Sequence, residues 1–229
     1  MTHSPQHVCA LRGAGCVLAV VNVKLLAGIL CAGACLAQEW EVGGSIGYGI
    51  YRDVRVNGPG ADATVGIRNR FAAGAVVAEN QYEHISGEVR YLFQDGDPFL
   101  SRNGVQANIQ GQSHTLTYDV MFHIRQREAR LRPYGTLGLG GKFYRTTGPE
   151  PFVQPAPNVA FLAHDNEWKV VVAVGGGVSY RFQNHLVLRA DFLDYITPFP
   201  KLLFVPVTSG TARGLFQQFT PMLGVAYGF

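Results

Sequence analysis

Apolar and polar residues alternate with a period of two in eight segments of this chain. In each segment apolar residues occupy every second position, and small or polar residues fill the positions between them. This spacing places the two sets on opposite faces of a β-strand. The segments are residues 40–50, 65–77, 84–94, 113–124, 132–144, 169–182, 186–196 and 219–229. We therefore predict an all-β protein with eight strands.

Most charged residues of these segments lie on the face opposite to the apolar rows. Arg189 and Asp191, for example, alternate with Leu188, Ala190 and Phe192. In a transmembrane barrel the apolar row would face lipid and the charges would face the lumen. In a water-soluble sandwich the apolar row would be the core and the charges would face solvent. Periodicity alone does not separate these two alternatives.

The lengths of the connections favour the transmembrane barrel. Long connections, rich in Pro, Gly and Asp, alternate with short ones along the chain. The long ones are residues 51–64, 95–112, 145–168 and 197–218, and the short ones are 78–83, 125–131 and 183–185. Bacterial barrels have long extracellular loops, short periplasmic turns and an even number of strands. The predicted fold is an eight-stranded antiparallel up-and-down transmembrane β-barrel with both ends in the periplasm.

The N-terminal segment has the layout of a secretory signal peptide. An uncharged apolar run, residues 25–36, follows Lys24, and small residues lead to a cleavage site after residue 37. The run is too short for a membrane-spanning helix, which needs about 20 residues. A second apolar stretch at residues 17–23 suggests that translation starts within it. The predicted domains are a signal peptide at 1–37 and a barrel at 38–229.

The last strand ends on an outward aromatic row. Reading back from the terminus, every second residue is apolar or aromatic, and the row consists of Phe229, Tyr227, Val225 and Leu223. A barrel places such a row against lipid, and its last strand must pair with the first to close the wall. We expect these four residues to form a barrel-assembly signal. Because the sequence stops at Phe229, no periplasmic domain is expected after it.

Composition excludes several classes of function. All four cysteines precede the predicted cut, so the exported chain has no disulfide and no thiolate metal site. Of 19 basic residues, Arg12 and Lys24 lie in the signal peptide, which leaves 17 against 16 acidic residues and no basic field for nucleic acid. The remaining histidines are scattered along the segments. No metal, cofactor or nucleic acid is expected.

The exported segment resembles the small eight-stranded outer-membrane barrels of the OmpA and OmpX type. The resemblance lies in the architecture of the whole segment and in the closing Tyr227-Gly228-Phe229. It implies insertion by the barrel-assembly machinery and residence among outer-membrane lipids and lipopolysaccharide in a bacterial outer membrane. It implies no particular activity, and an extracellular partner stays unknown.

Charged side chains on the lumen face are the main candidate site. They are Glu88, Arg90, Asp119, Lys142, Arg189 and Asp191. An eight-stranded barrel is just wide enough to be filled by its own side chains, and buried charges there must pair. We expect these residues to form a network of ion pairs that holds the barrel rigid. The alternative is a gate whose ion pairs exchange partners and open a narrow pore.

An enzyme is not expected. Lipid A-modifying enzymes also use eight-stranded barrels, and Ser113-His114 is the pair considered for such chemistry. Adjacent strand residues point to opposite faces, so these two cannot form a nucleophile and base together.

The apolar residues of the two last long loops suggest either packing over the barrel mouth or a binding surface. The expected function is therefore structural or surface interaction, with a narrow pore as the alternative.

Overall fold

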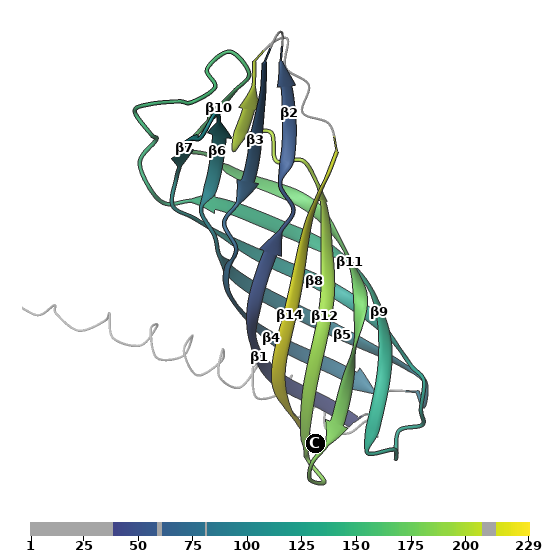
Figure 1. Cartoon of the computed structure of the whole chain (residues 1–229). Helices are drawn as coiled ribbons and strands as arrows, with labels where there is room; N and C mark the ends of the chain where they lie inside the picture. The colour runs from purple at the N-terminus through teal and green to yellow at the C-terminus, as the bar shows by residue number, and fades with distance from the viewer. Residues whose placement is uncertain (1–38, 59–60, 81, 208–213) are drawn as a thin grey trace, which may run out of the picture. The chain divides into compact units, whose positions relative to one another are not determined.

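The structure is a computed structural model that describes residues 39–58, 61–80, 82–207 and 214–229. Within these residues eight long strands form a closed antiparallel barrel (Figure 1). They are β1 (Glu39–Tyr51), β4 (Arg70–Asn80), β5 (Ile85–Asp95), β8 (Gly111–His123), β9 (Leu131–Thr146), β11 (Asn166–Arg181), β12 (Leu186–Pro198) and β14 (Leu215–Gly228). The predicted all-β, eight-stranded, up-and-down barrel is confirmed. The predicted signal peptide, 1–37, lies outside the described residues.

The last strand closes the wall on the first. Val42 of β1 is the register partner of Tyr227 of β14, and Ile50 is that of Phe219. Beyond the end of β14 the backbone NH of Phe229 donates to the carbonyl of Trp40 at 3.0 Å. Every long strand therefore has two hydrogen-bonded neighbours, which leaves no open edge within the barrel.

Strand length and one boundary differ from the prediction. Six of the eight barrel strands have 13 to 16 residues, more than the 9–11 or so that a tilted crossing needs, so these six extend past the membrane. The second barrel strand begins at Arg70 and not at residue 65, and Ile67, expected on the lipid face, is buried. The break occurs at Asn69, whose side-chain Oδ1 accepts the backbone NH of Tyr51 at 2.8 Å.

The long connections carry strands that the alternation did not predict. A four-stranded sheet contains β2 (Val54–Gly58), β3 (Ala61–Ile67), β6 (Pro98–Arg102) and β7 (Val105–Asn108), and a two-stranded sheet contains β10 (Ala160–Leu162) and β13 (Phe204–Pro206). Figure 1 shows these strands at the end of the barrel opposite the C-terminus. Since long loops are extracellular and short turns periplasmic, we call them the extracellular strands.

The extracellular strands share one apolar core with the barrel mouth. Tyr51, Tyr144 and Phe216 at the ends of barrel strands pack with buried residues of the long connections. We call this the outer apolar cluster; its other members are Val56, Ala63, Val65, Ile67, Leu100, Ile109, Ala156, Val159, Ala160, Leu162, Phe199, Leu203 and Phe204. Some of the apolar residues of the two last loops thus pack over the mouth, whereas Phe152, Val153, Phe161, Leu202 and Val205 stay exposed.

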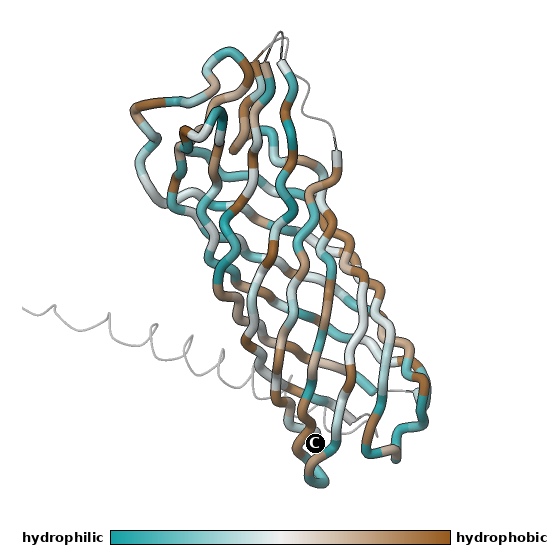
Figure 2. The backbone as a smooth tube through the Cα atoms, viewed as in Figure 1, coloured by the Kyte–Doolittle hydropathy of each residue, from teal (hydrophilic) through white to brown (hydrophobic). Residues whose placement is uncertain are grey.

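The outer surface of the barrel strands is apolar. Figure 2 shows hydrophobic residues recurring along these strands. Ile46, Leu139 and Leu223 are each more than 60% exposed to the surroundings, which would be unfavourable in water and suits lipid. Near the extracellular end, outward rings form a row in register, running through Phe93, His114, Phe143 and Trp168. Such a row is typical of the aromatic girdle at a membrane interface.

Candidate functional site: the barrel interior

Five of the six predicted lumen charges meet inside the barrel, near its periplasmic half. Glu88 and Arg90 come from β5, Asp119 from β8, and Arg189 and Asp191 from β12. None of the five is more than 7% exposed. Each lies on the inward face of its strand because its neighbours in the sequence are the lipid-facing residues. We call these three carboxylates and two guanidiniums the interior ion cluster.

Arg90 connects three strands within this cluster. Its Nη2 lies 2.7 Å from Glu88 Oε1, its Nε lies 3.2 Å from Asp119 Oδ2, and its Nη1 lies 3.1 Å from Asp191 Oδ2. A guanidinium has five N–H donors in a rigid plane, so one side chain can donate to several carboxylates that approach from separate directions.

Arg189 extends the cluster to β9. Its Nη1 lies 2.5 Å from Glu88 Oε2, and its Nη2 donates to the hydroxyl of Tyr134 at 3.1 Å. The Tyr134 hydroxyl donates in turn to Asp191. The Tyr134 ring also lies beside the guanidinium, with Cζ 5.6 Å from the ring centroid. The interior ion cluster therefore connects β5, β8, β9 and β12 across the lumen.

Lys142 was predicted to join this network of charges, and that prediction is wrong, because its side chain lies elsewhere in the lumen. Its Nζ contacts the Tyr51 hydroxyl at 3.0 Å and Gln218 Oε1, and no ion pair joins it to a carboxylate in the part of the chain that the structure describes. Its hydrogen-bond partners are uncharged because Lys142 faces a different level of the lumen from the other five residues. Contacts across a barrel depend on strand tilt and stagger, which residue spacing does not reveal.

An apolar layer separates the two levels. Along β5 the inward residues run from Arg90 through Leu92 to Gln94, and on β12 Leu193 follows Asp191 in the same way. Leu92 and Leu193 belong to a buried cluster that we call the inner apolar cluster. Its other members are Ala72, Val171, Ala173, Tyr195 and Met222. The lumen thus contains the ion cluster, an apolar layer, a polar layer with Lys142 and the outer apolar cluster.

The serine and histidine considered for catalysis do not meet. Ser113 is buried with its hydroxyl 3.3 Å from that of Tyr51, whereas His114 Nδ1 lies 2.7 Å from the hydroxyl of the outward-facing Tyr91. The expected orientation to opposite faces is confirmed. Ser113 and His114 therefore lie on opposite sides of the barrel wall and cannot act together as nucleophile and base.

A serine–histidine pair that the sequence did not predict does meet inside the barrel. Ser86 Oγ lies 2.8 Å from His123 Nε2 on the neighbouring strand, and His84-Ile85-Ser86 also has the two-residue spacing that favours a shared face. Ser86 is only 2% exposed, and His123 Nδ1 has no hydrogen-bond partner among the described residues. A catalytic triad needs an acid at that nitrogen and access for substrate. The pair has the character of an interior hydrogen bond.

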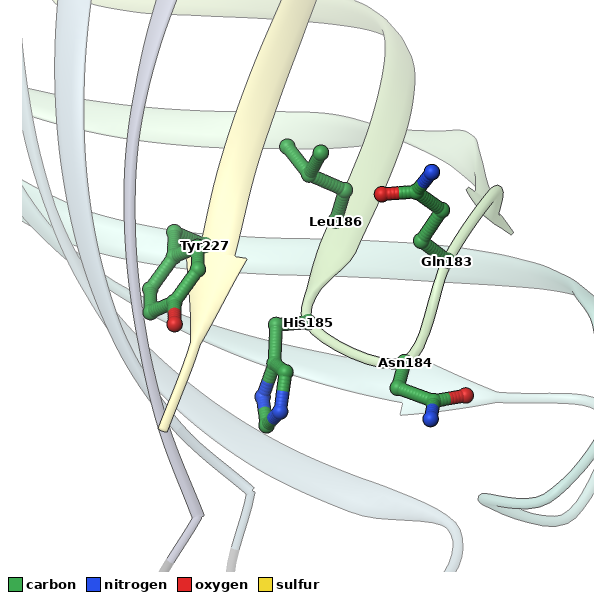
Figure 3. A pocket seen from close by; sticks show the side chains of 5 residues that line it. All are labelled: Gln183, Asn184, His185, Leu186 and Tyr227. Atoms are coloured by element: carbon green, nitrogen blue, oxygen red, sulfur yellow. The ribbon is translucent and has the colours of Figure 1, made fainter.

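The four residues predicted to form an assembly signal face outward at the periplasmic end of β14. Leu223, Val225, Tyr227 and Phe229 are all about half-exposed or more. Tyr227 stacks on His185 of the β11–β12 turn, with ring centroids 5.6 Å apart (Figure 3). His185 Nδ1 also lies 2.9 Å from the Gly228 carbonyl, and the Gly228 NH donates to the His185 carbonyl at 2.8 Å. These contacts fix the end of the closing strand.

A pocket lies at this turn, on the periplasmic rim of the barrel. Its volume is about 410 Å³, and its walls are Gln183, Asn184, His185, Leu186 and Tyr227 (Figure 3). Its residues make the turn and hold β14, and its only ionisable groups are an imidazole and a phenol. Among the residues that the structure describes, no three His, Cys, Asp or Glu side chains lie together in a way that would hold a metal ion.

A closed barrel with an apolar exterior, an aromatic row and a cluster of buried charges in its lumen defines an outer-membrane β-barrel protein. Neither a protein-family model nor a curated protein matches the sequence. A solved major outer membrane protein from Thermus thermophilus has the same fold, with a TM-score of 0.50, 14% identity and coverage of 85% of this chain and 100% of that one.

Two further solved structures resemble the chain. Neisserial surface protein A matches with 9% identity over 85% of this chain and 100% of that one, at a TM-score of 0.49. The outer membrane protein OprG from Pseudomonas aeruginosa matches with 11% identity over 84% of this chain and 96% of that one, at a TM-score of 0.48. At these identities the likeness concerns the fold alone.

Proposed function

We propose that the protein is a closed barrel of the bacterial outer membrane that stabilises the membrane and holds a folded sheet at the cell surface. The observation that carries this proposal is the filled lumen. Charged, apolar and polar layers follow one another along its length, and the extracellular strands pack on the last of them. A lumen closed by its own side chains favours a structural or surface-interaction role over transport.

Lipopolysaccharide is the proposed surface partner. Arg55 of β2 and Arg68, just before β4, are exposed on the extracellular side. The nearby Arg70 is already engaged, with ion pairs to Asp95 at 3.0 Å and to Asp97 at 2.5 Å. Exposed guanidiniums at this level suit the phosphates of lipopolysaccharide, since arginine binds phosphate through paired hydrogen bonds.

The test compares two double variants with equal charge loss. Arg55→Gln with Arg68→Gln removes extracellular cations, and Arg125→Gln with Arg130→Gln removes exposed cations from a periplasmic turn. Binding of lipopolysaccharide to the purified protein in detergent micelles is measured for each. We expect the first variant to bind about tenfold more weakly, at roughly 0.5–1 kcal/mol per exposed contact, and the second to bind like the wild type. Equal binding by both variants would contradict the proposed partner.

The second candidate function is a narrow gated pore. It is favoured by the alternative partners within the interior ion cluster, because Arg189 lies 2.5 Å from Glu88 and also 3.8 Å from Asp191. A guanidinium that moved between these carboxylates would change the shape of the lumen at that level. Conductance distinguishes this candidate from the closed barrel.

We also propose that an assembly factor recognises the outward-facing apolar residues of β14 during insertion. Leu223, Val225, Tyr227 and Phe229 are available on the barrel exterior, and the backbone of Phe229 pairs with Trp40 at the closing seam. A factor that delivers the last strand to the first would meet this row first. The barrel-assembly machinery is therefore the proposed partner during insertion.

A further inference from the structure

Small residues gather on the lipid face where the last strand meets the first. Gly44 on β1, Ala73 and Ala75 on β4, and Ala190 on β12 all occupy outward positions. Outward positions elsewhere on the wall carry mostly valine, leucine and aromatic side chains. The strands concerned are consecutive in the wall, in the order β4, β1, β14 and β12 (Figure 1). We call their lipid-facing surface the closing seam.

Two shallow grooves run along the closing seam. The upper groove, nearer the extracellular end, has a volume of about 580 Å³, and its walls include Tyr48 and Phe192. The lower groove has a volume of about 620 Å³ and is lined in part by Gly44. The register partners Ile46 and Leu223 line both grooves and form the ridge between them. Their mainly apolar walls suit hydrocarbon chains.

Both grooves lie in the outer half of the membrane. Ile50 is the last outward apolar residue of β1, and the exposed Arg52 follows it at the extracellular end. Gly44 precedes Ile50 by six positions, which is roughly 15 Å of depth at about 3.3 Å per residue and a tilt of about 40°. Since the hydrocarbon core is about 30 Å thick, this depth corresponds to one leaflet. The grooves therefore face the lipids of the outer leaflet.

Two exposed guanidiniums lie at the extracellular end of the upper groove. The Tyr48 hydroxyl donates to the Asn69 carbonyl at 2.8 Å, which connects the groove to the segment that carries Arg68. On the other side, Arg52 Nη1 donates to Gln217 Oε1 at 3.1 Å. This contact uses one of the five N–H donors of the Arg52 guanidinium. Neither arginine pairs with a carboxylate in the part of the chain that the structure describes.

The carboxylates at this level are directed elsewhere. Asp95 and Asp97 both pair with Arg70. Asp194 accepts a hydrogen bond from Gln217 Nε2 at 3.1 Å. Asp53, although adjacent to Arg52 in the sequence, places its carboxylate beside Gly66 of the extracellular sheet. The guanidiniums above the grooves are therefore free to bind phosphate, which arginine does through paired hydrogen bonds.

We propose that the closing seam binds the lipid A portion of one lipopolysaccharide molecule. Its phosphates contact Arg52 and Arg68, and its acyl chains occupy the two grooves. This inference rests on the proposed lipopolysaccharide partner and adds the surface that holds the lipid chains. Lipopolysaccharide occupies the outer leaflet, and it combines phosphate groups with several acyl chains, as the arrangement of arginines above two grooves requires.

Native mass spectrometry of the purified protein in detergent micelles tests the site. Gly44→Leu fills the lower groove, and a Cβ at residue 44 meets only the Gly74 carbonyl oxygen, at 3.8 Å, so the lumen is undisturbed. Gly135→Leu is the matched control. A Cβ on this outward glycine of β9 meets only the Gly175 carbonyl oxygen, at 4.0 Å, and the residue lies outside both grooves. Each form is incubated with lipid A, and the fraction that retains one lipid is measured.

The wild type and Gly135→Leu are expected to retain one lipid A equally. Gly44→Leu is expected to bind it about fivefold more weakly, the loss that follows when roughly ten van der Waals contacts are removed. Phosphatidylglycerol with acyl chains of the same length is the second probe. We expect the wild type to retain it less than lipid A, because it offers fewer chains and a single phosphate.

The outcomes separate this site from the proposed function. If Gly44→Leu retains lipid A like the wild type while the double variant of Arg55 and Arg68 loses it, the grooves do not bind the chains and the lipopolysaccharide partner stands. Equal retention of phosphatidylglycerol and lipid A by the wild type would also overturn the site. If the wild type retains no lipid A, both the site and the proposed partner are wrong.

Discussion

Arg90 on β5 and Asp191 on β12 pair across the lumen, although 101 positions separate them in the sequence, with Nη1 and Oδ2 3.1 Å apart. This contact joins opposite parts of the wall that share no backbone hydrogen bonds. A barrel wall alone fixes only neighbouring strands, whereas the interior ion cluster fixes strands that the wall does not connect. The stability of the barrel should therefore depend on the cluster.

Removing one carboxylate of the cluster should destabilise the barrel strongly. Glu88→Gln leaves Arg90 and Arg189 short of an anion, and breaking a buried pair in this way costs about 3–5 kcal/mol. The free energy of unfolding is measured by urea titration in micelles. Asp62→Asn, an exposed acid on β3, is the matched control and should change stability by less than about 0.5 kcal/mol. Similar losses in both variants would contradict the importance of the cluster.

Glycines that face the cluster leave the space that its side chains occupy. A Cβ on Gly177 would lie 2.5 Å from the Ala190 carbonyl oxygen, 2.6 Å from Asp191 Oδ1 and 2.8 Å from the Tyr134 hydroxyl. Gly177→Ala should therefore cost about 1–3 kcal/mol through overpacking.

Gly44 supplies the control for that substitution. A Cβ there would meet only the Gly74 carbonyl oxygen, at 3.8 Å, because the residue faces outward. Gly44→Ala should be close to neutral in the same urea titration. If Gly44→Ala is as destabilising as Gly177→Ala, steric contact with the cluster is not the cause.

The alternation of residues predicted the barrel because membrane crossing enforces a strict period. Lipid on one side and the packed lumen on the other give inward and outward positions a different chemistry, and the alternation holds along most of each barrel strand. Strands outside the membrane face no such constraint. The extracellular strands have only three to seven residues, so their alternation is too short to separate from loops rich in Gly and Pro.

One local signal could have revealed part of the extracellular sheet. Asn103 and Gly104 join β6 to β7, with φ of 50° and 80°. Two adjacent left-handed residues are what a two-residue hairpin turn requires, and Asn-Gly is the preferred pair. The separation of Lys142 from the other lumen charges had no comparable signal, since the level at which inward side chains meet depends on the stagger of strands around the wall.

The Asn-Gly turn leads to a prediction about the extracellular sheet. Gly104→Val places a β-branched residue at φ 80° and should destabilise the β6–β7 hairpin by about 1–2 kcal/mol. Hydrogen exchange at Leu100 and Ala107, which are register partners, is expected to become faster. Exchange on β12 should be unchanged. Equal acceleration on both strands would mean that the substitution acts on the whole barrel.

Loss of the terminal residue should impair assembly in cells. Deleting Phe229 removes an outward ring and the backbone pairing with Trp40, so less folded barrel should accumulate in the outer membrane. The heat-modifiable fraction on gels measures this amount. Phe182→Ala removes an equally exposed ring next to a periplasmic turn and is the control. Normal abundance of the deletion variant would count against an assembly signal at the terminus.

Conductance across a planar bilayer tests the closed barrel most directly. The protein is reconstituted as the wild type and as Glu88→Ala and Arg189→Ala, and a general porin added at the end to the same bilayer verifies that channels can be detected. With the lumen filled by the interior ion cluster and two apolar clusters, the wild type is expected to show no unitary current steps. The variants are expected to stay silent too, because the apolar clusters remain. Reproducible steps from the wild type, altered in size or frequency by Glu88→Ala, would contradict the closed barrel and establish the pore.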